Sequence, residues 1–190
     1  MTRIVALGGT VNPGSSTEQA LRLAATIAER EGAQVQVFGG DYLTALPHYL
    51  GPTHDPSWGA QMVEAVREAD GLLIAAPGYH GTISGLVKNA LDYLEDLARD
   101  ERPYLDGRAV GLIATAFGEQ ASMSTLLTMR AITHALRGWP TPMGATIRTH
   151  PGLFSDDGTC LDPRTLGQLE LVGRQVVFGA RSFAAARAKA

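Results

Sequence analysis

Short apolar runs alternate along the chain with longer stretches in which apolar residues recur every three or four positions. This alternation is typical of strands and amphipathic helices in successive βαβ units. The run from Gly71 to Ala76 is apolar throughout, as expected for a parallel strand that is covered on both faces. The pattern predicts an α/β fold with strands near 3–8, 34–38, 71–76, 109–115 and 142–147, and helices near 17–31, 57–69, 84–98, 122–137 and 163–186.

The segment 40–56 contains Gly, Pro and Tyr without a clear period, which predicts a loop that borders a site or an interface. His48 and His54 lie in it, with Asp41 and Asp55 nearby. Their spacing matches no helical or finger-type metal site, so we expect a solvated loop and no metal ligand.

Composition and charge restrict the classes of protein. With 190 residues, 45% of them hydrophobic, the chain predicts one domain over residues 1–190. A net charge of −3 with scattered basic residues argues against nucleic acid and anionic membranes as partners. No stretch approaches the roughly 20 apolar residues of a membrane span, and Met1 to Arg3 lead directly into a strand, so we expect a cytoplasmic protein. The lone Cys160 cannot form an internal disulfide.

A glycine-rich loop follows the apolar run 71–76 and leads into a helix. Open α/β sheets bind ligands at this position, outside the carboxyl ends of their strands. Gly78, Gly81 and Gly85 leave main-chain N–H groups accessible, which suits a planar heterocycle. The alternative is an ordinary turn whose glycines only permit a positive φ.

The loop after the first strand is rich in hydroxyl groups and precedes a helix. Helix N-termini attract anions through unpaired N–H groups and partial positive charge, which predicts a phosphate site. A simple helix cap by Ser15 or Ser16 is the alternative, and no Walker motif is present. The candidate phosphate-binding residues are Thr10, Asn12, Ser15, Ser16 and Thr17.

A third loop follows the fourth apolar run and contains Thr115 and Gly118. Because a doubly wound sheet brings the carboxyl ends of its strands together, we expect all three loops to border one cleft.

These motifs resemble the NADPH-dependent FMN reductase family. The similarity is carried by Pro77, Tyr79, His80, the Gly81 to Gly85 stretch and Lys88 to Asp92. It implies a flavodoxin-like, doubly wound, five-stranded parallel sheet of order 2-1-3-4-5 with helices on both faces. It also implies FMN as cofactor and NADPH (or NADH) as hydride donor.

The resemblance assigns roles to the three loops. It places Pro77, Gly78, Tyr79, His80 and Gly81 along the flavin ring, Thr115 and Gly118 on its far side, and the first loop at the phosphate. The chain departs from the family pattern at Thr10, where a serine is usual, and at Asn12, where an arginine is usual. No arginine in these loops offers a partner for the 2′-phosphate of NADPH, so a preference for NADPH follows from the resemblance alone.

The C-terminal half resembles the branch that supplies reduced FMN to two-component monooxygenases. His134 stands where that branch has a π-bulge, and Gly152 to Gly158 resemble its acidic hairpin. The similarity implies a flavin-dependent monooxygenase as a possible partner, and a homodimer or homotetramer built through the helices after the third and fourth strands. These helices carry more apolar residues than one buried helix face requires, and the excess predicts a surface for a second copy. The residues are Leu91, Tyr93, Leu94, Leu97, Met123, Leu126, Leu127, Met129 and Ile132.

Other functions stay open. A reductase that retains FMN and acts on a quinone or azo compound is the main alternative. A flavodoxin-type electron carrier is disfavoured, because such carriers are usually strongly acidic and hold the flavin ring between aromatic side chains. Here the net charge is only −3, and Tyr79 is the one aromatic residue in the loop after the third strand. A non-flavin hydrolase or nucleotide-binding module on the same fold is also compatible. We name no catalytic side chain, because a flavin itself carries out hydride chemistry, and we expect His80 to pack beside the ring edge.

Overall fold

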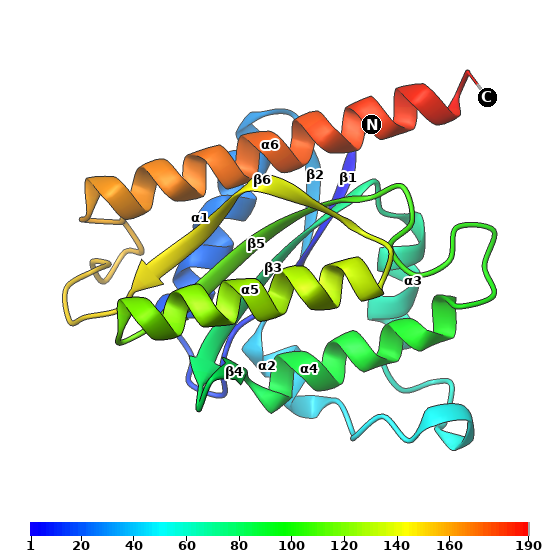
Figure 1. The fold of residues 1–190 in the computed structure, drawn as a ribbon, viewed down its shortest axis with the longest axis horizontal. Coiled ribbons are helices and arrows are strands. Elements are labelled where there is room, and N and C mark those ends of the chain that lie inside the picture. Colours follow the sequence, from blue (N-terminus) through cyan, green and yellow to red (C-terminus); the bar gives the residue numbers. More distant parts are fainter. Residues whose placement is uncertain (190) are drawn as a thin grey trace.

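The computed structural model describes residues 1–189, in which parallel strands form a central sheet (Figure 1). The strands are β1 (Arg3–Gly8), β2 (Gln34–Phe38), β3 (Gly71–Tyr79), β5 (Ala109–Ala116) and β6 (Trp139–Arg148), and their order is β2-β1-β3-β5-β6. A short strand, β4 (Thr82–Ile83), pairs antiparallel with the end of β3. Since β5 and β6 are the fourth and fifth strands of the predicted count, the flavodoxin-like order 2-1-3-4-5 is confirmed.

Helices cover both faces of this sheet, as predicted. In Figure 1, α1 and α6 lie on one side, and α3, α4 and α5 on the other. The helical elements are α1 (Ser16–Arg30), α2 (Gly40–Ala45), α3 (Ala60–Glu68), α4 (Gly85–Asp92), α5 (Glu119–Ala135) and α6 (Pro163–Arg187), with 3-10 turns η1 (Gly51–Thr53) and η2 (Tyr93–Leu97). Within residues 1–189, no helix combines the length and the apolar character that crossing a membrane requires.

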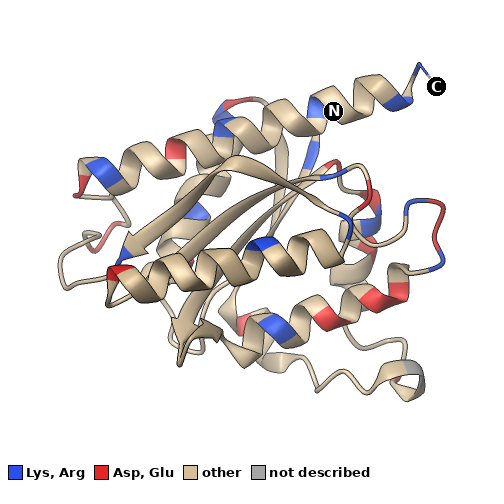
Figure 2. Cartoon of the chain, in the orientation of Figure 1, with Lys and Arg blue, Asp and Glu red and all other residues tan. Residues whose placement is uncertain are grey.

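Successive residues of each central strand enter two separate cores. Ile4 and Ala6 of β1 pack in the core under α1 and α6, whereas Val5 and Leu7 pack in the core on the opposite face. This two-sided burial explains why the strands are apolar throughout. Charged residues lie mainly on the helices and loops, and both signs are interspersed (Figure 2).

The segment 40–56 differs from the predicted solvated loop. It forms α2 and η1, and the side chain of His54 is only 7% exposed. His54 Nε2 lies 3.1 Å from Asp96 Oδ2, and its Nδ1 lies 2.9 Å from the carbonyl oxygen of Gly51. The histidine therefore anchors the segment to η2. Within residues 1–189, no group of three or more His, Cys, Asp or Glu side chains is placed to hold a metal ion.

At His134, where the resembling branch has a π-bulge, α5 is α-helical and continues so to Ala135. The N–H of Gly138 bonds to the carbonyl of Thr133, and the N–H of Arg137 bonds to that of His134. With Arg137 at a φ of 61°, these bonds form a Schellman cap. His134 therefore belongs to an ordinary helix end. The expected hairpin does form, through a bridge between Phe154 and Cys160.

The expected apolar surplus is smaller than predicted. Leu91, Tyr93, Leu94 and Leu97 are at most 4% exposed and pack in the core of their own chain. On α5, Leu126 and Met129 are buried as well, whereas Met123 and Leu127 are exposed. The helix after β3 therefore has no apolar surplus, and only α5 has one.

Candidate functional site

The loops that follow β1, β3, β5 and β6 border one cleft, at the carboxyl ends of the strands toward the lower left of Figure 1. The sheet places them there because parallel strands all end at the same edge. The lining residues are Thr10, Asn12, Ser15, Thr17, Pro77, Gly78, Tyr79, Thr115, Ala116, Phe117 and Thr149.

Most of the residues predicted from the sequence meet in this cleft. Those that do not line it are Ser16, His80, Gly81 and Gly118. Sequence reasoning did not include Ala116, Phe117 and Thr149 among the site residues. The signal for Thr149 was its position directly after the last strand, since that strand also ends at this edge of the sheet.

The first loop is shaped by its own hydroxyl groups. Thr10 Oγ1 accepts a hydrogen bond from the N–H of Asn12 and donates one to the carbonyl of Asn12. Ser15 caps α1 by accepting the N–H of Glu18 at 3.3 Å, so the predicted cap is present. The Ser15 hydroxyl proton remains able to donate, because capping uses only an oxygen lone pair.

The first turn of α1 carries an acid that would oppose an anion. Glu18 is 9% exposed, and Arg22 binds its Oε1 through Nε at 3.0 Å and Nη2 at 2.6 Å. This ion pair offsets the negative charge of Glu18. The start of α1 therefore carries no free carboxylate that would oppose an anion.

Thr17 and Thr115 join two walls of the cleft. Their Oγ1 atoms lie 2.6 Å apart, and the residues are 3% and 1% exposed. One hydroxyl donates and the other accepts, so the bond fixes the start of α1 against the end of β5. The two loops therefore keep a defined separation.

The loop after β3 is a tight hairpin. His80 and Gly81, with φ angles of 51° and 92°, connect the paired residues Tyr79 and Thr82. Two consecutive positive φ angles are typical of a type I′ turn. Gly81 therefore supplies conformational freedom, which was the alternative explanation for this glycine, while Tyr79 lies at the rim of the cleft with 49% exposure.

Gly78 is required for a different reason. A Cβ atom at this position would lie 2.3 Å from Thr125 Oγ1 on α5. The main chain at the end of β3 therefore packs directly against α5.

None of the residues that line the cleft is charged. Hydroxyl, amide and main-chain donors at the start of α1 suit a phosphate, and Pro77, Gly78, Ala116 and Phe117 offer apolar walls to a flat ring. These residues fit FMN. The assignment of individual residues to FMN stays a prediction.

Comparisons with known proteins agree with this geometry. Residues 2–150 match the family model described as NADPH-dependent FMN reductase. Over 98 residues, the chain is 38% identical to an FMN-dependent NADPH-azoreductase from Staphylococcus haemolyticus and 36% identical to one from Staphylococcus aureus (strain USA300). Each alignment covers 50% of this chain and 47% of the relative, so the chain spans about half the length of the curated relatives it matches.

Solved structures share the fold at lower identity. The flavoenzyme NAD(P)H:(acceptor) oxidoreductase FerB from Paracoccus denitrificans superposes with a TM-score of 0.77 at 19% identity, covering 96% of this chain and 99% of that chain. The apo form of an NADH:FMN oxidoreductase superposes with a TM-score of 0.68 at 19% identity, covering 93% and 90%.

Proposed function

The chain belongs to the NADPH-dependent FMN reductase family, and from this premise we propose that it transfers a hydride from NADPH or NADH to FMN bound in the cleft. The observation that carries the proposal is the meeting of a hydroxyl-rich helix start with apolar loop walls in one uncharged cleft. Asn12, Ser15 and the first turn of α1 hold the phosphate. Pro77 to Tyr79 and Thr115 to Phe117 flank the ring.

The residues of the chain act by positioning. FMN, when bound, supplies the atom that accepts the hydride. The hairpin at His80 and Gly81 and the bond between Thr17 and Thr115 fix the walls between which the ring lies. Orientation of this kind lowers the barrier to transfer. No side chain is assigned a proton-transfer role.

We further propose that reduced FMN leaves the enzyme and supplies a flavin-dependent monooxygenase. The support is the uncharged phosphate end of the cleft, where Asn12 stands in place of the family's usual arginine. An amide bonds to a phosphate more weakly than a guanidinium does, which favours exchange of the flavin. The hairpin before α6 agrees with this branch, whereas the ordinary end of α5 does not.

Retention of FMN with reduction of an azo or quinone acceptor is the second candidate. It is favoured by the relatives at 36% and 38% identity that are named FMN-dependent NADPH-azoreductases.

Flavin binding tests the proposed cofactor. Titration of the purified protein by flavin fluorescence is expected to show FMN binding at least about tenfold tighter than riboflavin, because only FMN carries the phosphate. Equal affinities would remove the phosphate assignment, and absence of flavin binding would remove the whole proposal.

Kinetics then distinguish supply from retention. If FMN is released, oxidation of NAD(P)H saturates with added free FMN and stays slow with a quinone or azo compound alone. Stoichiometric FMN after gel filtration, together with ping-pong reduction of such an acceptor, would establish the second candidate instead.

The assembly we propose is a homodimer or homotetramer formed through α5. Met123 and Leu127 lie one helical turn apart and are 49% and 60% exposed. Phe117, just before the helix, is 83% exposed. A second copy of the chain would remove this apolar surface from water.

A further inference from the structure

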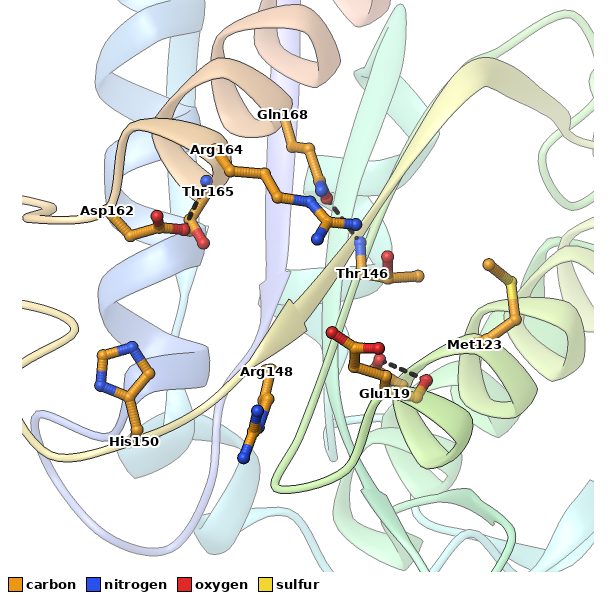
Figure 3. A pocket seen from close by; sticks show the side chains of 10 residues that line it. Glu119, Met123, Thr146, Arg148, His150, Asp162, Arg164, Thr165 and Gln168 are labelled. Carbon is orange, nitrogen blue, oxygen red and sulfur yellow. Dashed lines mark hydrogen bonds between the residues drawn. The ribbon is translucent and has the colours of Figure 1, made fainter.

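A second cavity, of about 490 Å³, adjoins the flavin cleft at the end of β6 (Figure 3). The same two loops border both: Phe117 and Thr149 line the cleft, whereas Glu119, Arg148 and His150 line the cavity. Its other wall is the first turns of α6. A ligand that occupies the cleft and extends along the protein surface therefore reaches this cavity next. Its volume falls within the usual range of small-molecule sites.

Two arginines line this cavity without an acidic partner. Arg164 extends from α6 toward Thr146 and the Glu119 carboxylate in Figure 3, whereas Arg148, between His150 and Glu119 in this view, extends away from Arg164. Among residues 1–189, neither arginine forms an ion pair with an aspartate or glutamate. Five other arginines do form ion pairs with acids: Arg3, Arg22, Arg67, Arg174 and Arg187.

The two acids of the cavity, Glu119 and Asp162, form no ion pair with these arginines. Asp162 Oδ2 accepts the N–H of Thr165 at 2.8 Å and caps α6, so this carboxylate is held at the start of the helix. Glu119 faces Arg164 across the cavity without pairing with it. The cavity therefore offers two guanidinium groups and two carboxylates that are not paired with them.

This combination suits a phosphate monoester attached to a group that carries hydrogen-bond donors. One guanidinium group can bind two phosphate oxygens through parallel N–H···O hydrogen bonds. A carboxylate accepts bonds from hydroxyl or amino groups such as those of adenosine. The 2′-phosphate of NADPH is a phosphate monoester on adenosine, and it is the group that NADH lacks.

We propose that Arg148 and Arg164 bind the 2′-phosphate of NADPH in this cavity and set the preference for NADPH over NADH. The inference rests on the proposed function, because it places the nicotinamide end of the same molecule in the flavin cleft. The expectation that the three binding loops contain no arginine for this phosphate is unchanged, because Arg148 ends the last strand and Arg164 follows the hairpin.

Binding of adenosine 2′,5′-bisphosphate to the full-length, FMN-loaded protein tests the proposal by calorimetry. We expect it to bind at least about tenfold tighter than adenosine 5′-monophosphate, as one charge-assisted contact would give. Arg148→Gln and Arg164→Gln are each expected to remove this difference. Arg174→Gln is the matched control, because Arg174 lies on α6 but pairs with Glu31; it should keep the difference.

Steady-state kinetics give a second readout. The two cavity variants should lose kcat/KM with NADPH by about tenfold more than with NADH. Equal affinity of the wild type for the two adenosine phosphates would overturn the proposal, as would an unchanged bisphosphate affinity in both cavity variants. If both variants instead weaken only the binding of a sulfonated azo dye, the cavity serves an anionic acceptor and the proposal is wrong.

Failure of this inference is distinct from failure of the proposed function. Flavin fluorescence measured on the same samples reports FMN binding independently of the bisphosphate. Tight FMN binding without bisphosphate discrimination would reject the 2′-phosphate site alone, whereas loss of flavin binding in the wild type would reject both.

Discussion

The hydroxyl pair of Thr17 and Thr115 is a buried contact on which the geometry of the cleft depends. Replacing Thr115 by valine keeps the shape but leaves the Thr17 hydroxyl buried without its partner. We expect a loss of about 1–3 kcal/mol in the free energy of unfolding. The double variant Thr17→Val with Thr115→Val should recover much of that loss, because both polar groups are then gone. Urea unfolding of the wild type, the two single variants Thr17→Val and Thr115→Val, and the double variant measures the coupling energy between the two hydroxyls. Additive losses of stability would contradict the coupling.

Gly78 provides a second prediction at the residue scale. Gly78→Ala would place a methyl group 2.3 Å from Thr125 Oγ1, whose hydroxyl already bonds to the carbonyl of Ala121. We expect a loss of about 1–3 kcal/mol in stability and weaker FMN binding, because the ring loop must shift. Gly85→Ala is the control, since a Cβ there meets no atom within 4 Å. Equal effects of the two substitutions on the urea midpoint would refute the close-approach argument.

The start of α6 depends on its cap. Hydrogen bonds from the hydroxyl and N–H of Thr165 hold the pKa of Asp162 below its usual range. A lowered folded-state pKa stabilises the protein above the unfolded value of about 3.9 and loses this contribution as the pH falls through the folded value.

Two substitutions separate the cap from its charge. Asp162→Ala should lower the melting temperature at pH 7 by a few degrees, whereas Asp162→Asn keeps a good cap and should change it less. The difference between the wild type and the asparagine variant should shrink as the pH is lowered below 4. Thermal unfolding followed by circular dichroism checks both effects, and a wild-type melting temperature in Asp162→Ala would show that the cap is dispensable.

Elements with a strong apolar pattern could be predicted, and short ones could not. The strands at 3–8, 34–38 and 71–76 and the long helix at 163–187 stand out because each buries a continuous face. Helix α2 spans six residues and β4 two, so neither is long enough to show a period. The helix expected over 84–98 changes at Tyr93 into a 3-10 turn. The spacing of apolar residues in the sequence does not distinguish this turn from a continued α-helix.

The candidate site shows the same limit. Loops after strands could be located because the carboxyl ends of parallel strands meet, and eight of the cleft's lining residues were found in this way. The burial of His54 could not be foreseen, because it depends on Asp96, which is 42 residues further along the chain. The cavity that Arg148 and Arg164 line could not be predicted either. It exists only once β6 and α6 pack together, and the two arginines are separated in the sequence.

At the scale of the whole molecule, both cores share one sheet. Since alternate residues of the same strands enter opposite cores, neither core can form without the other. We propose that residues 1–190 fold as one unit. Calorimetry should therefore show one transition, and two resolved transitions would contradict a single domain.

The surface of α5 predicts how copies of the chain associate. Leu127 is 60% exposed beside Met123, and a self-associating face would bury both. Light scattering at micromolar concentration should give the mass of a dimer or tetramer for the wild type. Leu127→Glu should lower that mass, because a carboxylate buried in an apolar interface is costly. Phe178→Glu is a suitable control, since Phe178 is 74% exposed on α6, across the sheet from α5. A monomeric wild type would reject assembly altogether, whereas dissociation by Phe178→Glu but not by Leu127→Glu would place the interface on α6.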